Sequence, residues 1–295
     1  MSKKKSIILA FVVMLLWGSL FPMVKLGYAA YGIETTGDIL LFAGVRFVVC
    51  GVAICLYSFL RDKNSYKTIP SAWSLVLLSG LFAIVLHYAF TYSGLMLSES
   101  SKTAILKQIG ALLYVCFSFL FFKNDKPTVP KIIGAFLGFA GVIAINLDGC
   151  GISFGLGDVL ILLASFCTVA SNIVSKRALR KVSPITMTGT SQLFGGIVLL
   201  IAGLLLGGRM SFSLQTSYIL LYICVASSIS YCIWFTVVRD GSLSNLFIIK
   251  FAEPAFACIF GWAILGEDIL KPQYLLAFIL ISAGIYIANR VRKTK

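Results

Sequence analysis

Long apolar runs dominate this 295-residue chain, and they limit its possible folds more than any other feature. A helix needs about 20 mostly apolar residues to cross the hydrocarbon layer of a bilayer, which is about 30 Å thick. Ten runs approach or reach this length, and short charged segments separate them. We therefore expect an all-α integral membrane protein, because a helix satisfies its own backbone polar groups in lipid. The expected spans are residues 6–24, 39–60, 73–92, 103–122, 132–147, 159–175, 185–206, 218–238, 245–265 and 274–288.

Composition supports this expectation and excludes a nucleic-acid-binding protein. Hydrophobic residues make up 59% of the chain and charged residues 12%, whereas soluble domains average about 45–50% and about 25%. The net charge of +14 comes from Lys and Arg in the short gaps between apolar runs. This distribution is typical of membrane topology, so we expect a lipid bilayer around the protein and no nucleic acid partner.

The basic residues are unevenly divided between the two sides that ten alternating spans define. With the N-terminus in the cytoplasm, eighteen Lys and Arg residues fall in cytoplasmic segments and four fall outside. The four are Lys25, Lys102, Arg209 and Lys271. Basic residues concentrate on the cytoplasmic side of membrane proteins. We therefore predict a multi-pass protein of the plasma membrane with both termini in the cytoplasm.

The two halves of the chain resemble each other. A shift of 143 positions places spans three to five on spans eight to ten without a gap. The matched pairs include Tyr88 with Tyr231, Ser101 with Ser244, Lys107 with Lys250, Phe117 with Phe260, and Asp125 with Asp268. We predict two repeats of five helices, residues 1–148 and 149–295. Because five is odd, the repeats are inverted, which is typical of secondary transporters that bind substrate near the midplane and work by alternating access.

Several short motifs in this order resemble the drug/metabolite transporter superfamily, specifically its EamA-type ten-helix members. They are Trp17-Gly18-Ser19 with Phe21 and Lys25, Arg46-Phe47, and Glu253-Pro254-Ala255-Phe256 followed by Gly266-Glu267. The resemblance covers essentially the whole chain and implies transport of small metabolites such as amino acids; we expect export. The first half departs from the family pattern, with Lys107-Gln108-Ile109-Gly110 where a proline is common and Lys123-Asn124-Asp125 in place of Gly-Glu.

Ionisable side chains within the spans are the first candidates for a substrate site, because such groups are costly in lipid and usually face a cavity or a partner. They are Arg46, His87, Lys107, Lys250 and Glu253. Three cations against one carboxylate leave an excess of positive charge. We therefore expect a small-molecule substrate with a carboxylate or phosphate group, zwitterionic amino acids included.

Each of these groups also has a structural interpretation. Lys250 and Glu253 are three residues apart on one helical face and can simply pair. Pro254 leaves the carbonyl oxygen of Lys250 without its helical donor, which also suits a substrate site or a gate. Lys107 is near the outer end of its span and can reach the surface instead of binding. For Arg46 we expect a structural tie to backbone carbonyls or helix ends.

Aromatic and polar side chains complete the candidate site. His87 and Tyr88 in the third span, and Tyr231 and Trp234 in the eighth, occupy matching regions of the two repeats. Such side chains often line small-molecule cavities, although core packing or an interfacial belt is the more frequent explanation for them. Three further candidates offer hydrogen bonds or close helix contacts, namely Trp17, Ser19 and Asn172.

Other classes of function have weaker support. The chain has one histidine, no HExxH motif and no CxxC pair among its eight cysteines, so we expect no enzyme, no metal site and no cofactor. A channel, a receptor or an assembly protein remains an alternative, although no rings of acidic residues indicate a pore. A coupling proton would need Glu253 or His87, and a monomer and a homodimer are both open.

Overall fold

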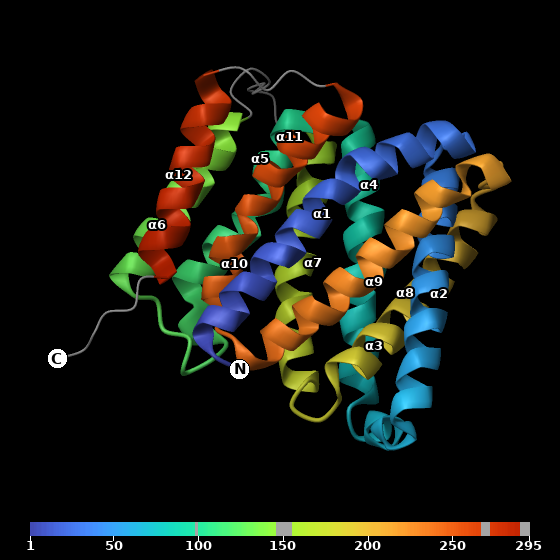
Figure 1. The fold of residues 1–295 in the computed structure, drawn as a ribbon, viewed down its shortest axis with the longest axis horizontal. Helices are drawn as coiled ribbons and strands as arrows, with labels where there is room; N and C mark the ends of the chain where they lie inside the picture. Colours follow the sequence, from blue (N-terminus) through green and yellow to red (C-terminus); the bar gives the residue numbers. More distant parts are fainter. Residues whose placement is uncertain (98–99, 146–154, 267–271, 290–295) are drawn as a thin grey trace.

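The computed structural model describes residues 1–97, 100–145, 155–266 and 272–289, and every regular element in these ranges is helical (Figure 1). The first five expected spans correspond to α1 (Lys3–Tyr31), α2 (Thr36–Arg61), α3 (Trp73–Gly80) with η2 (Leu81–Leu86) and α4 (His87–Leu97), α5 (Ser100–Phe117), and α6 (Val129–Ile145). The others correspond to α7 (Leu156–Ala178), α8 (Pro184–Leu205), α9 (Ser217–Asp240), α10 (Leu243–Lys250) with α11 (Ala252–Leu265), and α12 (Pro272–Asn289). Short 3₁₀ helices are η1 (Lys63–Ser71), η3 (Ser118–Leu120) and η5 (Leu214–Thr216).

Eight helical segments of the described chain are long and apolar enough to cross a membrane. The fourth and fifth expected spans contain shorter apolar helices, Leu106–Leu120 and Val129–Ala144. The chain is therefore an all-helical protein with multiple membrane-spanning helices.

Two expected spans are not continuous α-helices. The third contains a π-helical turn, η2, between α3 and α4. The ninth is interrupted at Phe251, between α10 and α11. Pro254 lies three residues after this interruption, in the first turn of α11, where its missing N–H cannot continue the α-helical ladder. Both irregular positions adjoin candidate site residues, because His87 follows η2 and Lys250 ends α10.

Glycines allow α2 and α8 to pack backbone against backbone. Both helices carry glycine at every seventh residue: Gly37, Gly44 and Gly51 on α2, and Gly189, Gly196 and Gly203 on α8. A Cβ added to Gly44 would lie 2.4 Å from the Leu200 nitrogen, and one added to Gly203 would lie 2.4 Å from the Leu41 nitrogen. We call this contact the glycine seam. Small residues permit such close approach of membrane helices.

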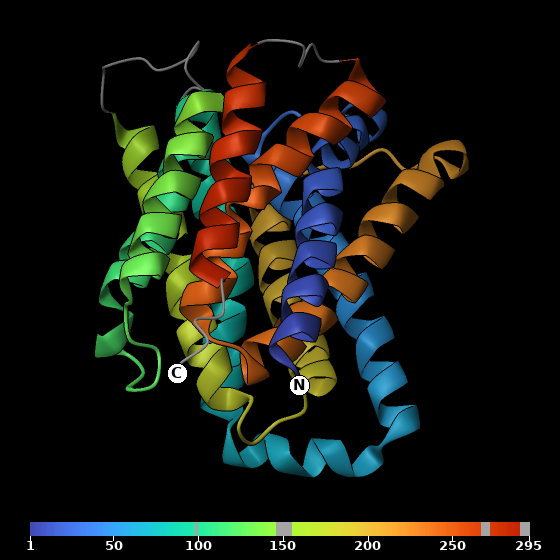
Figure 2. The ribbon, with the colours of Figure 1, turned by 60° about the vertical axis from the view of Figure 1, so that its left-hand side comes forward.

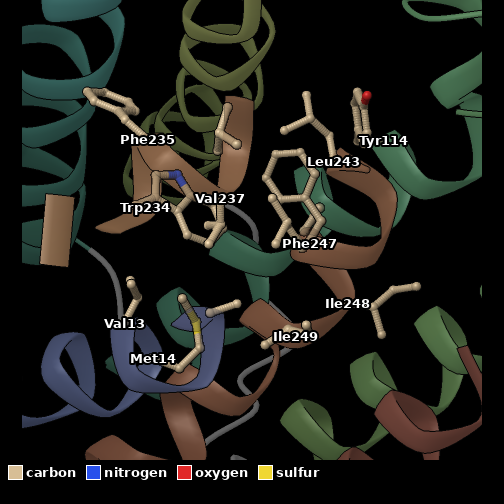
Figure 3. Close-up of a cluster of buried hydrophobic side chains, with 14 of the residues drawn as sticks. Val13, Met14, Tyr114, Trp234, Phe235, Val237, Leu243, Phe247, Ile248 and Ile249 are labelled. Carbon is tan, nitrogen blue, oxygen red and sulfur yellow. The ribbon is translucent and has the colours of Figure 1, made fainter. Parts of the chain in front are cut away.

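The helices α6 and α12 also pack closely. A Cβ added to Gly134 would lie 2.5 Å from the carbonyl oxygen of Gly284. The helix α1 packs on α9 and α11, while α7 packs on α3, α4 and α5. The largest apolar core cluster includes Met14, Tyr114, Trp234 and Phe247, from α1, α5, α9 and α10 (Figure 3). The centre of the molecule is thus built from both halves of the sequence.

One end of the bundle holds the described ends of the chain. Lys3 Nζ donates a hydrogen bond to the carbonyl of Asn289 at 3.0 Å, so the start of α1 lies beside the end of α12. The helix η1 runs across the same end of the bundle (Figure 2).

At this end, the buried Asp125 carboxylate joins the loop after η3 to the start of α10. It receives hydrogen bonds from Lys131 Nζ at 3.0 Å, Ser242 Oγ at 2.5 Å and the Ser244 backbone N–H at 3.0 Å. Burial alone would raise the pKa of Asp125, but these hydrogen bonds outweigh it and hold the pKa below its ordinary value. The ionised carboxylate therefore connects α6 and α10 at the end that holds the N-terminus.

Candidate functional site

The break between α10 and α11 holds an ion pair. Lys250 Nζ lies 2.6 Å from Glu253 Oε2, and both side chains are largely buried. The same ammonium group lies 4.8 Å from the centre of the Trp17 ring, which α1 contributes. An ammonium at this distance over an aromatic face is attracted by the ring. Three helices thus meet at Lys250.

Lys107, which α5 contributes, lies within electrostatic range of this ion pair but is not itself paired with any carboxylate of the described residues. Its Nζ lies 5.5 Å from the centre of the Phe21 ring, and it is within electrostatic range of both Lys250 and Glu253. No hydrogen bond or ion pair joins its ammonium group to any residue that the structure describes. Lys107 lies seven residues into α5, or about 10 Å at 1.5 Å per residue.

The residue at the position of Glu253 in the first half is Gly110, and packing explains it. Ser165 of α7 accepts a hydrogen bond from the Gly110 N–H at 2.8 Å and donates one to the Lys107 carbonyl at 2.8 Å. A Cβ on Gly110 would lie only 2.5 Å from this Ser165 hydroxyl oxygen. Because α7 occupies the space, a carboxylate side chain does not fit there.

His87 and Tyr88 lie directly after the π-helical turn. His87 Nδ1 lies 3.2 Å from the carbonyl oxygen of Ala164 and 3.1 Å from Thr168 Oγ1, both on α7. Donation from Nδ1 to the carbonyl leaves Nε2 as the acceptor nitrogen. His87 is also within electrostatic range of Lys107 and Lys250. π-Helical turns are rare overall, and those that occur are often found at functional sites.

Aromatic rings connect these residues through a continuous series of ring contacts, in which Phe47 is fully buried. The centre of the Trp17 ring lies 5.6 Å from that of Tyr231, whose ring in turn lies 6.2 Å from Phe47. Phe47 lies 4.9 Å from Tyr88, and Tyr88 lies 5.1 Å from His87. Trp17, His87, Tyr88 and Tyr231 are all partly exposed. We use the name aromatic bed for the five linked residues Trp17, Phe47, His87, Tyr88 and Tyr231.

Three of the candidate residues serve as buried ties between helices. Trp234 Nε1 donates to Asn172 Oδ1 at 2.8 Å, which joins α9 to α7. Ser19 donates to the Leu16 carbonyl at 2.8 Å and shares a hydrogen bond of 2.6 Å with the Tyr222 hydroxyl. Trp234, Asn172 and Ser19 are each less than 5% exposed. Their hydrogen bonds hold α1 and α7 to α9, and α1 and α9 are the helices that carry Trp17 and Tyr231 of the aromatic bed.

Arg46 differs from its expected environment. Its Nη2 donates to the Tyr88 hydroxyl at 3.3 Å, and its guanidinium lies 4.6 Å from the centre of the Phe47 ring and 5.6 Å from that of Tyr88. Among the described residues, the Arg46 side chain donates no hydrogen bond to a backbone carbonyl. The expected tie to carbonyls or helix ends is therefore replaced by contact with aromatic rings.

Two contributions to the site were missed in the sequence. Phe21 and Phe47 supply ring faces to Lys107 and Arg46, and both lie in the motifs quoted for the family resemblance. Thr168 and Ala164 position His87, but nothing in the sequence marks them. Within the described ranges, no three His, Cys, Asp or Glu side chains converge as metal ligands would.

An apolar groove lies apart from this site. It has a volume of about 590 Å³ and runs between α1, α11 and α12. Its lining includes Phe11, Phe256, Phe278 and Tyr286 but no charged side chain. The groove therefore lacks the charged side chains found around Lys107, Lys250 and Glu253.

Known proteins resemble this chain along its whole length. The sequence model of the EamA-like transporter family matches residues 4–147 and again residues 155–290. The uncharacterized transporter YvbV of Bacillus subtilis is 26% identical over 99% of this chain and 93% of its own. The uncharacterized inner membrane transporter YedA of Escherichia coli is 24% identical over 94% of this chain and 90% of its own.

A plant protein and a protein of known structure also resemble this chain. The chloroplastic WAT1-related protein At3g02690 of Arabidopsis thaliana is 25% identical over 84% of this chain and 62% of its own. One protein of known crystal structure superimposes with a TM-score of 0.81, over 97% of both chains at 18% identity. At this identity the superposition establishes a shared fold.

Proposed function

The chain belongs to the EamA-like transporter family, and on this premise we propose that it is a secondary transporter of a small metabolite that works by alternating access in the plasma membrane. Its relatives are named transporters, and one is named an inner membrane transporter. We propose export as the direction, with both termini in the cytoplasm. The meeting of Lys3 with Asn289 at one end of the bundle supports an even number of spans.

The pattern of helix contacts supports two inverted repeats of five spans, residues 1–148 and 149–295. In this proposal α1 corresponds to α7, α2 to α8, and α6 to α12. The glycine seam joins α2 to its counterpart, and α6 packs on α12 in the same way. The contacts of α1 with α9 and α11 are matched by those of α7 with α4 and α5. The two matches of the family model, to residues 4–147 and 155–290, also support this division.

We propose that the substrate binds over the aromatic bed, with an anionic group beside Lys107. The observation that carries this proposal is that Lys107 faces an ion pair without having a carboxylate of its own. Since Glu253 is already paired with Lys250, a carboxylate or phosphate of the substrate is the natural counter-ion for Lys107. An amino acid fits this chemistry, because Glu253 can also approach an ammonium group.

Transport by purified protein in proteoliposomes tests the proposal. We expect saturable uptake of labelled amino acids or organic acids that shows counterflow, whereas a channel shows no counterflow and a receptor shows no flux. Lys107→Gln removes the unpaired cation and should reduce the transport of anionic substrates at least tenfold. Lys67→Gln is the matched control, because Lys67 lies on the exposed helix η1. Correctly inserted Lys107→Gln protein with wild-type transport would overturn the proposed site.

A further inference from the structure

Arg46 is a buried cation near the middle of a spanning helix. It lies ten residues after the start of α2, or about 15 Å along the helix axis. Only 3% of the surface of Arg46 is exposed. Within the described ranges its buried Nε has no hydrogen-bond partner, and its side chain makes one hydrogen bond, to the Tyr88 hydroxyl. The guanidinium is therefore held by aromatic groups and left with unused donors.

No protein carboxylate among the described residues compensates this charge. The ion pairs of the described chain join Met1 to Asp240, Lys131 to Asp125, Arg239 to Asp240, and Lys250 to Glu253. A guanidinium cannot release its proton to escape burial, and an uncompensated buried charge is strongly unfavourable. The excess positive charge of the spans therefore resides on two side chains, Arg46 and Lys107.

The two cations border the same aromatic bed. The Arg46 guanidinium contacts Phe47 and Tyr88. Lys107 is within electrostatic range of His87 and of Lys250, and Lys250 contacts Trp17. Tyr231 links these two groups, because its ring lies beside both Phe47 and Trp17. Tyr88 and Tyr231 are partly exposed, so a ligand on these rings would lie close to the guanidinium, which is 5.6 Å from the centre of the Tyr88 ring.

We propose that Arg46 and Tyr88 form a second anion-binding point, and that the substrate carries two anionic groups joined by an apolar or aromatic part. This inference rests on the proposed function. One anion would bind Lys107 and the other Arg46, so that two negative charges compensate two positive charges. The apolar or aromatic part of the substrate would lie on the rings between Lys107 and Arg46. The Tyr88 hydroxyl, which accepts a hydrogen bond from Arg46, can donate its own proton to the second anion.

Binding of matched probes to the purified full chain tests this inference. The probes are linear dicarboxylates from succinate to suberate and benzene-1,4-dicarboxylate, each compared with its own monomethyl ester. The ester removes one charge and changes the shape little. We expect at least one dicarboxylate to bind ten times more tightly than its ester, measured by calorimetry and by thermal stabilisation.

Variants locate the discrimination. Arg46→Gln should remove the preference for the dicarboxylate and leave the affinity for the ester within twofold of wild type, while Lys107→Gln should weaken both. Tyr88→Phe keeps the ring and the guanidinium and should weaken only the dicarboxylate, about threefold or more, so it serves if Arg46→Gln does not fold. Lys67→Gln is the control and should change neither affinity.

The outcomes separate this inference from the proposed function. Wild-type protein that binds and transports monoanions but prefers no dicarboxylate to its ester would overturn the second anion point alone. Retention of the preference in Arg46→Gln or, where that variant is unfolded, in Tyr88→Phe would overturn it equally. Absence of binding and transport for every anionic probe would overturn the anionic substrate itself.

Discussion

Lys250 Nζ and Glu253 Oε2 lie 2.6 Å apart across the break between α10 and α11. The break itself comes from Pro254, and the ion pair bridges the two helices that it separates. Removal of one member of a buried ion pair leaves an uncompensated charge, whereas removal of both does not. The pair therefore has a structural role that can be separated from a role in transport.

We expect Glu253→Gln to destabilise the protein more than the double variant Lys250→Gln/Glu253→Gln. Loss of one partner should cost about 3 kcal/mol, by analogy with other buried pairs, and the double variant should recover part of this. Thermal unfolding in detergent measures both effects. A loss in the double variant that equals the sum of the losses in Lys250→Gln and Glu253→Gln would show that the charges are not coupled.

The Asp125 network predicts a dependence of stability on pH. Because the pKa of Asp125 is lower in the folded protein than in the unfolded chain, its contribution is fully present above the ordinary aspartate pKa of about 4. This contribution is lost as the pH falls through the lower folded value. The melting temperature of the wild type should therefore fall below about pH 4 more steeply than that of Asp125→Asn.

At pH 7 the wild type should be more stable than Asp125→Asn, because the amide cannot replace the charged acceptor for Lys131. Asp62→Asn is a suitable control, since Asp62 is exposed and caps only η1. Parallel melting curves of wild type and Asp125→Asn across this pH range would contradict the assigned role of the carboxylate.

The glycine seam predicts a large effect from a single methyl group. Gly44→Ala would place a Cβ 2.4 Å from the Leu200 nitrogen, and overpacking of this kind typically costs about 1–3 kcal/mol. The expected result is a lower melting temperature and a lower yield of inserted protein. Gly155→Ser is the control, because Gly155 has open space around its Cβ position and serine suits the start of a helix. Equal stability of the two variants would mean that the seam can separate without cost.

Coupling to protons can be tested at the same site. We expect an imposed proton gradient to drive accumulation of substrate, with Glu253 or His87 as the group that takes up the proton. The variant Lys250→Gln/Glu253→Gln should keep counterflow but lose this accumulation if Glu253 is that group, and His87→Gln should do so if it is His87. Accumulation that is unchanged in both variants would mean that a group other than Glu253 and His87 takes up the proton. Accumulation that is absent in the wild type would indicate exchange or facilitated diffusion.

The sequence predicted the positions of the helices better than their interiors. Apolar runs marked each spanning segment, because composition alone decides what can enter lipid. The spacing of Lys250 and Glu253 predicted that they could pair, since three residues span about one helical turn. Nothing in Leu81–Leu86 distinguishes a π-helical turn from an α-helical one, so the position of His87 relative to its neighbours could not be derived.

The rotation of each helix decided the rest of the site. A polar residue in an apolar helix can face a cavity or bond to a neighbouring helix, and the sequence is the same in both cases. Trp234 and Asn172 bond to each other, and Ser19 bonds to Tyr222. Arg46 contacts aromatic rings where carbonyls were expected, because its hydrogen-bond partner Tyr88 comes from another helix, α4. Such contacts depend on tertiary packing, which periodicity does not encode.

The glycine seam has a consequence for how the protein can move. It fastens α2, from the first part of the chain, to α8, from the second, and the contact of α6 with α12 does the same at another place. Two halves that are joined backbone to backbone at two places cannot rock against each other as rigid blocks without prying the glycines apart. We expect α2 with α8 and α6 with α12 to form a stationary frame, and the helices that carry Trp17, Lys107 and Lys250 to tilt within it.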